Sequence, residues 1–163
     1  MSNDLQRTSK IITELYNEYV DMVYRICFML LRNPTDAEDV VQAVFVKVIE
    51  KDVQFKNKEH EKAWFIVTTQ NHCKNQLKHW WKKNIAFDMN YHDAYYSDEH
   101  SEILEIVLKL PDKYKMPIYL HYYEGYSTDE IANLLKINAS TLRSRLKKGR
   151  EILKNILGGE LLE

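Results

Sequence analysis

Apolar residues recur at steps of three and four along most of the chain, and this spacing limits the fold more than any other feature of the sequence. Such steps place apolar side chains on one face of an α-helix, which then packs against other helices. The 163 residues include only four glycines and three prolines, so few positions interrupt the pattern. The sequence predicts an all-α fold, with helices over residues 11–31, 35–49, 63–83, 101–110, 115–123, 128–135 and 139–156.

A stretch without clear periodicity divides these helices into two groups. Residues 85–100 hold tyrosines among acidic and amide side chains and lack the apolar steps. Three long helices precede this stretch and four shorter ones follow it, and 163 residues are enough for two small domains. We predict a three-helix domain over residues 1–84, a linker over 85–100 and a four-helix domain over 101–163.

The charges are distributed unevenly along the chain. The formal net charge is -1, which neither favours nor excludes a nucleic-acid ligand. Residues 63–84 carry lysines and no acid, and residues 141–154 carry six basic residues against Glu151 alone. Residues 88–112 reverse the balance, with seven acids against Lys109. Two basic stretches separated by an acidic one predict two anion-binding faces.

Two short helices joined by a tight turn form the most specific pattern, over residues 127–150. Ser127 and Glu130 are spaced as a capping box before the first helix, and Asn138 is placed to cap the second. This is the layout of a helix-turn-helix, whose second helix enters the major groove of DNA. The alternative is an ordinary cationic surface helix. Such a helix would not explain why a capping box, a turn and the core spacing occur together. The outward positions near the start of the second helix, which we expect to reach base edges, are Ala139, Ser140, Arg143, Ser144 and Lys147. We expect phosphates to be contacted by Arg145, Lys148 and Arg150, and DNA also by Thr141.

Residues 36–45, Asp-Ala-Glu-Asp-Val-Val-Gln-Ala-Val-Phe, resemble a helix of the extracytoplasmic-function sigma factors of the sigma-70 family. The resemblance covers about residues 15–157, in two blocks separated by a variable linker. In that family this helix docks on the clamp coiled coil of the largest subunit of RNA polymerase. Ala43 replaces the family's usual glutamate. The alternative interpretation is that Asp36, Glu38 and Asp39 only stabilise the start of a helix. The resemblance implies that core polymerase is bound by Asp36, Asp39, Gln42 and Phe45.

The rest of the first block is similar to the family's promoter-melting helix. Ala63-Trp64-Phe65 and residues 71–77 carry this likeness. In the family, this helix meets the −10 element of the promoter, and the loop before it holds a flipped base. Amide donors and nearby cations suit an unstacked base and its phosphates. The residues implied by this match are Lys56, Asn57 and Lys58 in the loop, and Asn71, Lys74, Asn75 and Lys78 on one face of the helix.

The second block resembles the family's domain that reads the −35 element. Residues 110–125 and Thr141-Leu142-Arg143-Ser144-Arg145-Leu146 match its patterns, although Lys136 stands where a glycine is frequent. The resemblance implies an RNA polymerase sigma factor that binds core polymerase, at its clamp and flap, and promoter DNA, and so directs sequence-specific transcription initiation. Family members are commonly held inactive by an anti-sigma factor, so the resemblance makes such a partner a candidate, and the sequence leaves open whether this chain has one. A plain DNA-binding regulator without polymerase contact is the alternative.

Other classes of function have little support in the sequence. The six histidines show no metal-ligand spacing, and there is no phosphate loop or nucleophile elbow, so we expect neither an enzyme nor a cofactor or metal site. Cys27 and Cys73 lie in apolar helical patterns and are expected to be buried free thiols. No apolar run is long enough to span a membrane. We expect a cytoplasmic protein with no membrane partner.

Overall fold

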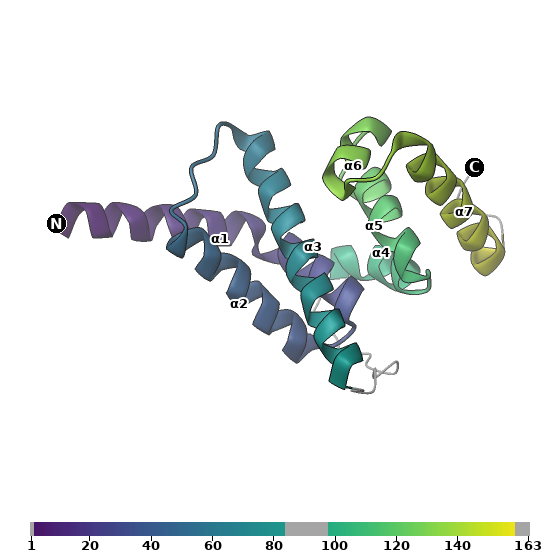
Figure 1. The fold of residues 1–163 in the computed structure, drawn as a ribbon, viewed down its shortest axis with the longest axis horizontal. Coiled ribbons are helices and arrows are strands. Elements are labelled where there is room, and N and C mark those ends of the chain that lie inside the picture. The colour runs from purple at the N-terminus through teal and green to yellow at the C-terminus, as the bar shows by residue number, and fades with distance from the viewer. Residues whose placement is uncertain (1, 84–97, 159–163) are drawn as a thin grey trace. The chain divides into compact units, whose positions relative to one another are not determined.

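The structure is a computed structural model that describes residues 2–83 and 98–158. Within these ranges all regular elements are helices, which confirms the predicted fold class (Figure 1). The chain divides into two compact units, unit 1 over residues 1–93 and unit 2 over residues 94–163. Residues 84–97, which include most of the linker predicted over 85–100, lie outside the described residues.

Unit 1 consists of three helices that all pack against one another: α1 (Ser2–Leu31), α2 (Pro34–Glu50) and α3 (Lys58–Lys83). Each helix turns its apolar face inward, as the periodicity predicts. An aromatic group lies at the centre, where the Phe65 ring is 4.5 Å from the Tyr19 ring and 5.3 Å from the Phe45 ring. The fully buried side chains include Val23, Ile26, Cys27, Met29, Ala37, Val44, Phe65, Ile66 and Cys73.

The first helix begins at Ser2 and not at residue 11, so the predicted start was wrong. Its first turns extend past the rest of unit 1 (Figure 1). Side chains there are exposed from Asn3 to Glu14, apart from the half-buried Ile12. This part lacks glycine and proline, which would break a helix, and the Thr8 hydroxyl donates to the Asp4 carbonyl oxygen at 2.8 Å. Apolar periodicity marks only the part of a helix that is buried.

The second helix also begins earlier than predicted, because Asn33 is its N-cap and not Thr35. The Asn33 backbone is extended, and its side-chain oxygen accepts from the Asp36 N–H at 3.2 Å. Pro34 then occupies the first helical position, where its missing N–H costs nothing. Pro34 is therefore the first residue of α2, and it does not act as a break before the helix.

Unit 2 contains α4 (Asp98–Leu108), α5 (Asp112–Ile118), η1 (Tyr119–Tyr123), α6 (Thr128–Leu135) and α7 (Ala139–Leu157). The element η1 is one turn of π-helix that continues α5, so the unit has the four helical segments expected of it within its described residues. Helix α4 begins three residues before residue 101, and α5 begins three residues before residue 115. Gly125 ends the segment with a positive φ of 78°, as glycine permits.

The core of unit 2 joins all of its helices and includes one charged residue. Lys115 is fully buried, and its Nζ lies 2.9 Å from Oδ1 of Asp112. Ile156 was expected on the inner side of α7 but is 43% exposed, so the buried stripe of α7 ends at Leu153. Fully or almost fully buried side chains are Leu104, Val107, Leu110, Tyr119, Leu120, Ile131, Leu142 and Leu146. Among the helices of the described ranges, none is both long and apolar enough to cross a membrane.

Candidate nucleic-acid interface

The turn between α6 and α7 has the geometry of a helix-turn-helix. The Ser127 hydroxyl accepts from the Glu130 N–H at 3.2 Å, and a Glu130 carboxylate oxygen accepts from the Ser127 N–H at 3.4 Å, so the capping box is confirmed. Asn138 caps α7 by accepting from the Thr141 N–H at 2.8 Å. Lys136 takes the left-handed conformation, with φ 54° and ψ 46°, although it is not a glycine. The turn therefore forms as predicted, at a cost of about 1–2 kcal/mol in that residue's backbone.

Buried apolar residues fix the angle between the two helices. Ile131 on α6 and Leu142 and Leu146 on α7 are at most 2% exposed. Gly149 lies where α7 packs against α5: a Cβ atom there would be 2.8 Å from Cγ1 of Ile118. Because real Cβ atoms do not approach another atom so closely, only glycine fits without a shift of the Ile118 side chain or of the helices. Apolar periodicity does not mark this position, since glycine has no side chain.

The opposite face of α7 carries the residues that we expected to read base edges. Arg143, Ser144 and Lys147 are exposed, and so is Ser140, whose hydroxyl donates to Oδ1 of Asn138 at 2.9 Å. Thr141 is half-buried beside them. This face belongs to the N-terminal half of the second helix, which is the part that enters the major groove in a helix-turn-helix.

The three residues expected at phosphates lie on the flanks of this face. Arg145 and Arg150 are half-buried, whereas Lys148 is exposed. Nη1 of Arg150 donates to the Tyr122 hydroxyl at 3.2 Å, so this guanidinium is already oriented within the unit. Nζ of Lys148 is 3.8 Å from a Glu151 carboxylate oxygen, and both side chains are more than half exposed. Such a surface ion pair contributes little and can be exchanged for a phosphate.

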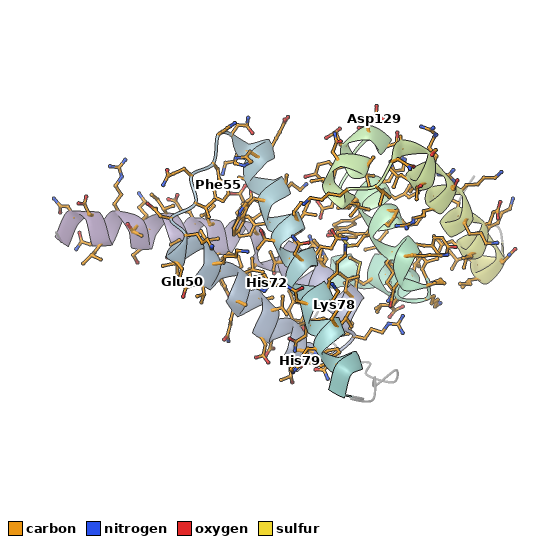
Figure 2. The ribbon with its side chains drawn as sticks, viewed as in Figure 1. Glu50, Phe55, His72, Lys78, His79 and Asp129 are labelled. Carbon is orange, nitrogen blue, oxygen red and sulfur yellow. The ribbon has the colours of Figure 1, made fainter. Side chains whose placement is uncertain are left out.

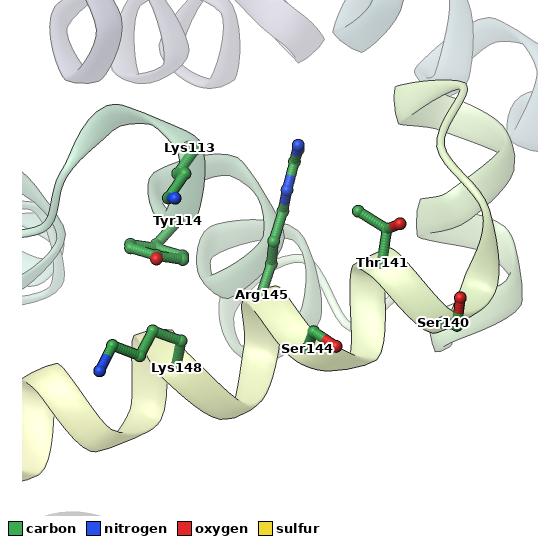
Figure 3. Close-up of a pocket in the computed structure, with 7 residues that line it drawn as sticks. All are labelled: Lys113, Tyr114, Ser140, Thr141, Ser144, Arg145 and Lys148. Atoms are coloured by element: carbon green, nitrogen blue, oxygen red, sulfur yellow. The ribbon is translucent and has the colours of Figure 1, made fainter.

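A cleft of about 380 Å³ separates α7 from the start of α5 (Figure 3). Lys113 and Tyr114 of α5 line it on one side, opposite Arg145 and Lys148. The Nζ of Lys113 lies 5.0 Å from the centre of the Tyr114 ring. Lys113 was missed in the sequence, since it is separated from the basic stretch of α7 by about thirty residues and belongs to a mixed-charge segment. Ser140, Thr141 and Ser144 complete the lining.

In unit 1, the predicted polar face of α3 is present. Asn71, Lys74, Asn75 and Lys78 are all exposed, and their steps of three and four place them along one side of the helix. Lys78 lies near the C-terminal end of α3 (Figure 2). The two amides and two lysines can donate hydrogen bonds to base edges and phosphates. Trp80, by contrast, is 8% exposed and is part of the core.

The loop before α3 is shorter than predicted, because α3 begins at Lys58. The side chain of Asn57 caps this helix by accepting from the His60 N–H at 2.8 Å. In return, Nδ1 of His60 accepts from the Lys56 N–H at 3.1 Å. The Phe55 ring packs edge-on against both His60 and Trp64, at 5.7 Å. The exposed side chains of Lys56 and Asn57 are therefore presented by a backbone that these bonds hold in place.

Lys58 was expected to bind DNA from this loop, but its amine forms ion pairs within unit 1. Its Nζ lies 2.9 Å from a Glu18 carboxylate oxygen and 3.1 Å from one of Glu61, and these bonds raise the pKa of Lys58. The same Glu61 oxygen accepts from the Tyr19 hydroxyl at 2.7 Å. Burial and the bond to Glu61 raise the pKa of Tyr19. This cluster joins the start of α3 to α1. Lys58 therefore stabilises unit 1, whether or not it also contacts DNA.

The expected polymerase-binding residues of α2 divide into surface and core. Asp39 and Gln42 are exposed and Asp36 is half-buried. Burial and the neighbouring Asp39 raise the pKa of Asp36, so the two carboxylates repel each other. Phe45 is only 6% exposed and packs on the Tyr16 ring at 5.0 Å. We therefore no longer assign Phe45 to the contact with polymerase, because its ring fills the core of unit 1.

A groove of about 390 Å³ lies between α2 and α3, next to Asp39. The small side chain of Ala43, at the position of the family's glutamate, leaves this space open. Nε2 of His72 is buried without a hydrogen-bond partner in the described part of the chain, and burial followed by repulsion from Lys47 lowers the pKa of His72. His72 and His79 lie along α3 (Figure 2). The other lining residues are Val40, Asn75 and Gln76.

Features of a metal site are not found in the part of the chain that the structure describes. No group of three or more histidine, cysteine, aspartate or glutamate side chains there is positioned to hold a metal ion. Cys27 and Cys73 are free and buried, as predicted. The described surface instead presents amides, hydroxyls and cations on exposed helix faces, which suit DNA.

Comparisons with known proteins agree with this division of the chain. Residues 15–82 match the family model for sigma-70 region 2, and residues 100–153 match the model for sigma-70 region 4. The extracytoplasmic-function RNA polymerase sigma factor SigW of Bacillus subtilis is 26% identical over 88% of this chain and 87% of its own length.

Two solved structures share the fold. The sigma factor RpoE of Bartonella quintana, solved with the anti-sigma factor NepR, superposes with a TM-score of 0.73 at 20% identity, over 91% of this chain and 98% of that chain. CnrH, solved with the cytosolic domain of CnrY, superposes with a TM-score of 0.62 at 18% identity, over 93% of this chain and 90% of that chain. With both region models matched in order and a full-length relative of the same kind, the chain belongs to the extracytoplasmic-function sigma factors of the sigma-70 family.

Proposed function

We propose how this protein divides the work of an RNA polymerase sigma factor, which binds core polymerase and promoter DNA to direct sequence-specific transcription initiation. Residues 1–84 act as region 2 and bind core polymerase and the −10 element. Residues 101–163 act as region 4 and bind the −35 element, and residues 85–100 connect the two. The observation that carries this proposal is the exposed face of α7, which presents hydroxyls and cations. The apolar residues on the opposite side of the helix are buried and fix its position.

The −35 element is read by the first turns of α7. Ser140 and Ser144 are small and exposed, so the helix backbone can approach the floor of the major groove. Arg143 and Lys147, on one edge of this face, are long enough to reach guanine O6 and N7. Arg145, Lys148 and Arg150 flank the face and bind phosphates, which fixes the register of the helix on DNA.

The −10 element is bound by the polar face of α3 and by the loop before it. Asn71 and Asn75 offer amide donors for bases, and Lys74 and Lys78 offer cations for phosphates. Lys56 and Asn57 are presented by a capped loop end, which suits a pocket for an unstacked base. Lys58 supports this loop through its ion pairs with Glu18 of α1 and Glu61 of α3.

Core polymerase is bound by the exposed stripe of α2. Asp39 and Gln42 lie on the same side of the helix, and Asp36 lies one turn before Asp39. The repulsion between the two carboxylates is relieved when a cationic side chain of the partner approaches them. This gives the clamp of polymerase an electrostatic reason to dock at this end of α2.

The protein works by binding and not by catalysis, as an initiation factor that acts where polymerase and DNA are, in the cytoplasm. Of the two solved structures, RpoE was captured with the anti-sigma factor NepR, and CnrH with the cytosolic domain of CnrY. We infer that this chain also has an anti-sigma partner that covers its polymerase-binding surface. Co-purification of the chain from its own cells, with and without α2 substitutions, tests this inference.

Run-off transcription tests the function directly. Purified core polymerase is incubated with a pool of genomic promoter fragments, with and without the protein. We expect new start sites only when the protein is present. If the protein shifts the fragments in a gel but adds no transcript, it is a plain regulator and the sigma role is wrong.

Arg143 tests base readout on the promoters that this assay identifies. We expect Arg143→Ala to cost about 1–3 kcal/mol at one base pair of the −35 element and to leave other positions unchanged. The matched control is Lys154→Ala, since Lys154 is exposed on α7 but lies beyond its N-terminal half. A promoter-mutant scan that shows equal loss at all positions for Arg143→Ala contradicts base readout by this residue.

A further inference from the structure

The cleft between α5 and α7 brings together charges that are far apart in the sequence. Lys113 comes from the first turn of α5, and Arg145 and Lys148 come from α7 (Figure 3). Three hydroxyl side chains, Ser140, Thr141 and Ser144, line the same space. The Ser140 hydroxyl already donates to Asn138, so three cations and the hydroxyls of Thr141 and Ser144 are left to face a volume of about 380 Å³. These groups match the chemistry of a phosphate, which accepts hydrogen bonds on its oxygens and carries negative charge.

The residues that line the cleft in the described structure include no acid, so the cleft is positive. The carboxylate of Asp112, next to Lys113 in the sequence, is paired with the buried Lys115, with Oδ1 2.9 Å from Nζ. Glu151 is 3.8 Å from Lys148, a long and exposed pair that a phosphate can replace. The Tyr114 ring beneath Lys113 is 9% exposed, so it forms a firm floor that holds the ammonium group over its face.

The position of the cleft indicates which phosphate it takes. On α7, Arg145 and Lys148 lie to one side of Ser144, and Arg143 and Lys147 lie to the other side. When the exposed face of α7 enters the major groove with Arg143 and Lys147 toward the bases, the flank that carries Arg145 and Lys148 lies toward the backbone of one strand. The cleft then faces one strand only.

We propose that Lys113, together with Arg145 and Lys148, binds one phosphodiester of the DNA backbone beside the −35 element. Helix α5 is thereby a part of the DNA-binding surface and not only a support for α7. The contact is independent of sequence and sets how α7 lies in the groove. This inference rests on the proposed function, since it requires that α7 binds the −35 element.

Salt dependence of binding measures the number of phosphates that the protein neutralises. We expect Lys113→Gln, in holoenzyme assembled from core polymerase and the full chain, to reduce the slope of log affinity against log salt by about 0.9. The loss is the same for every −35 sequence variant. Lys113→Arg retains the slope, and Lys109→Gln is the matched control, because Lys109 is an exposed lysine of unit 2 that does not line the cleft.

Neutral methylphosphonate links, placed one at a time along both strands of the element, locate the contact. One position should weaken wild-type holoenzyme and cause no further loss with Lys113→Gln. Equal penalties for the two proteins at every position overturn the phosphate contact of Lys113. Wild-type holoenzyme that ignores the −35 sequence altogether overturns instead the proposed function of α7, and the two failures are therefore distinguishable.

A free anion has the same chemistry as a backbone phosphate, and added inorganic phosphate separates the two. At constant ionic strength, we expect no competition with DNA at millimolar phosphate. Saturable phosphate binding without DNA that is lost in Lys113→Gln, together with a DNA salt slope that Lys113→Gln leaves unchanged, assigns the cleft to a free anion and overturns the DNA contact.

Discussion

At the scale of single residues, Gly149 has the most stringent surroundings of the glycines that the structure describes. It lies in the middle of α7, where glycine is otherwise less favourable than alanine by about 1 kcal/mol. The nearest atom to its missing Cβ is Cγ1 of Ile118, a branched side chain that is itself only 3% exposed. Close packing of α7 on α5 therefore outweighs helix propensity at this position.

This competition gives a prediction with a clear sign. We expect Gly149→Ala to lower the free energy of unfolding of unit 2 by about 1 kcal/mol, since overpacking by about 1–3 kcal/mol exceeds the gain in helix propensity. Chemical denaturation followed by circular dichroism measures it. Ser144→Ala, on the exposed side of α7, is the control. A more stable Gly149→Ala would mean that α5 and α7 separate easily.

His72 provides a second residue-scale test, through pH. In the folded state, burial and Lys47 lower the pKa of His72 below its ordinary value of 6.5. The unfolded chain therefore binds the proton more readily than the folded one. The stabilising contribution of neutral His72 is complete above pH 6.5 and is lost as pH falls from there through the folded pKa. We expect the unfolding free energy of wild type to fall over this range more steeply than that of His72→Gln. Parallel curves for the two proteins would contradict a buried neutral His72.

At the scale of elements, the sequence predicted which helices form better than where they begin. The buried faces of all seven predicted helices are present, because apolar spacing is what makes a helix pack. The starts of α2 and α3 were missed by a few residues, because Asn33 and Asn57 act as caps through side-chain bonds that periodicity does not record. Lys136 shows the reverse case, in which the hydrogen bonds that end α6 accompany a non-glycine residue at positive φ.

The candidate site could be predicted only in part: the exposed faces of single helices could, and the contacts between helices could not. The exposed faces of α3 and α7 follow from helical spacing alone, so their amides, hydroxyls and cations could be named from the sequence. Phe45 could not be assigned, since a family motif does not distinguish a residue that touches a partner from one that fills the core. Lys113 and the ion pairs of Lys58 arise from contacts between helices, and these exist only once the helices have packed.

The start of α3 gives the prediction for this scale. His60 holds the Lys56 backbone through Nδ1, and Asn57 holds His60 in return. We expect His60→Leu to weaken open-complex formation roughly fivefold, the effect of one hydrogen bond of about 1 kcal/mol, and to reduce discrimination at one −10 base. His60→Asn keeps an acceptor near the same place and should restore most of both. Permanganate footprinting of −10 variants measures the melting, and equal loss with both substitutions would argue against positioning of the loop by this bond.

At the scale of the whole molecule, we propose one DNA-binding surface on each of the two small units. Each surface contributes a few cations, and the net charge of the chain is only -1, so neither is expected to bind tightly alone. Joining two weak sites raises the effective concentration of the second once the first is bound. Promoters with both elements are then favoured over those with one.

Lengthening the connection tests this coupling. We expect a Gly/Ser insertion after Asn84 that doubles the length of residues 84–97 to lower holoenzyme occupancy about threefold on a promoter with both elements. Occupancy on a promoter that lacks the −35 element should not change. Equal loss on both promoters would show that the connecting residues themselves make a contact, and gel-shift titration distinguishes the two outcomes.

The buried cysteines make the chain convenient for fluorescence work. Cys27 and Cys73 are fully enclosed, and burial, followed by the hydrogen bond to Cys73, raises the pKa of the Cys27 thiol, so a maleimide dye finds no reactive thiolate in the folded protein. Dyes attached at Ser9→Cys on α1 and Lys154→Cys on α7 would therefore label one exposed position in each unit, with both native cysteines left in place. Energy transfer between them then reports, molecule by molecule, how far the units move apart when polymerase binds.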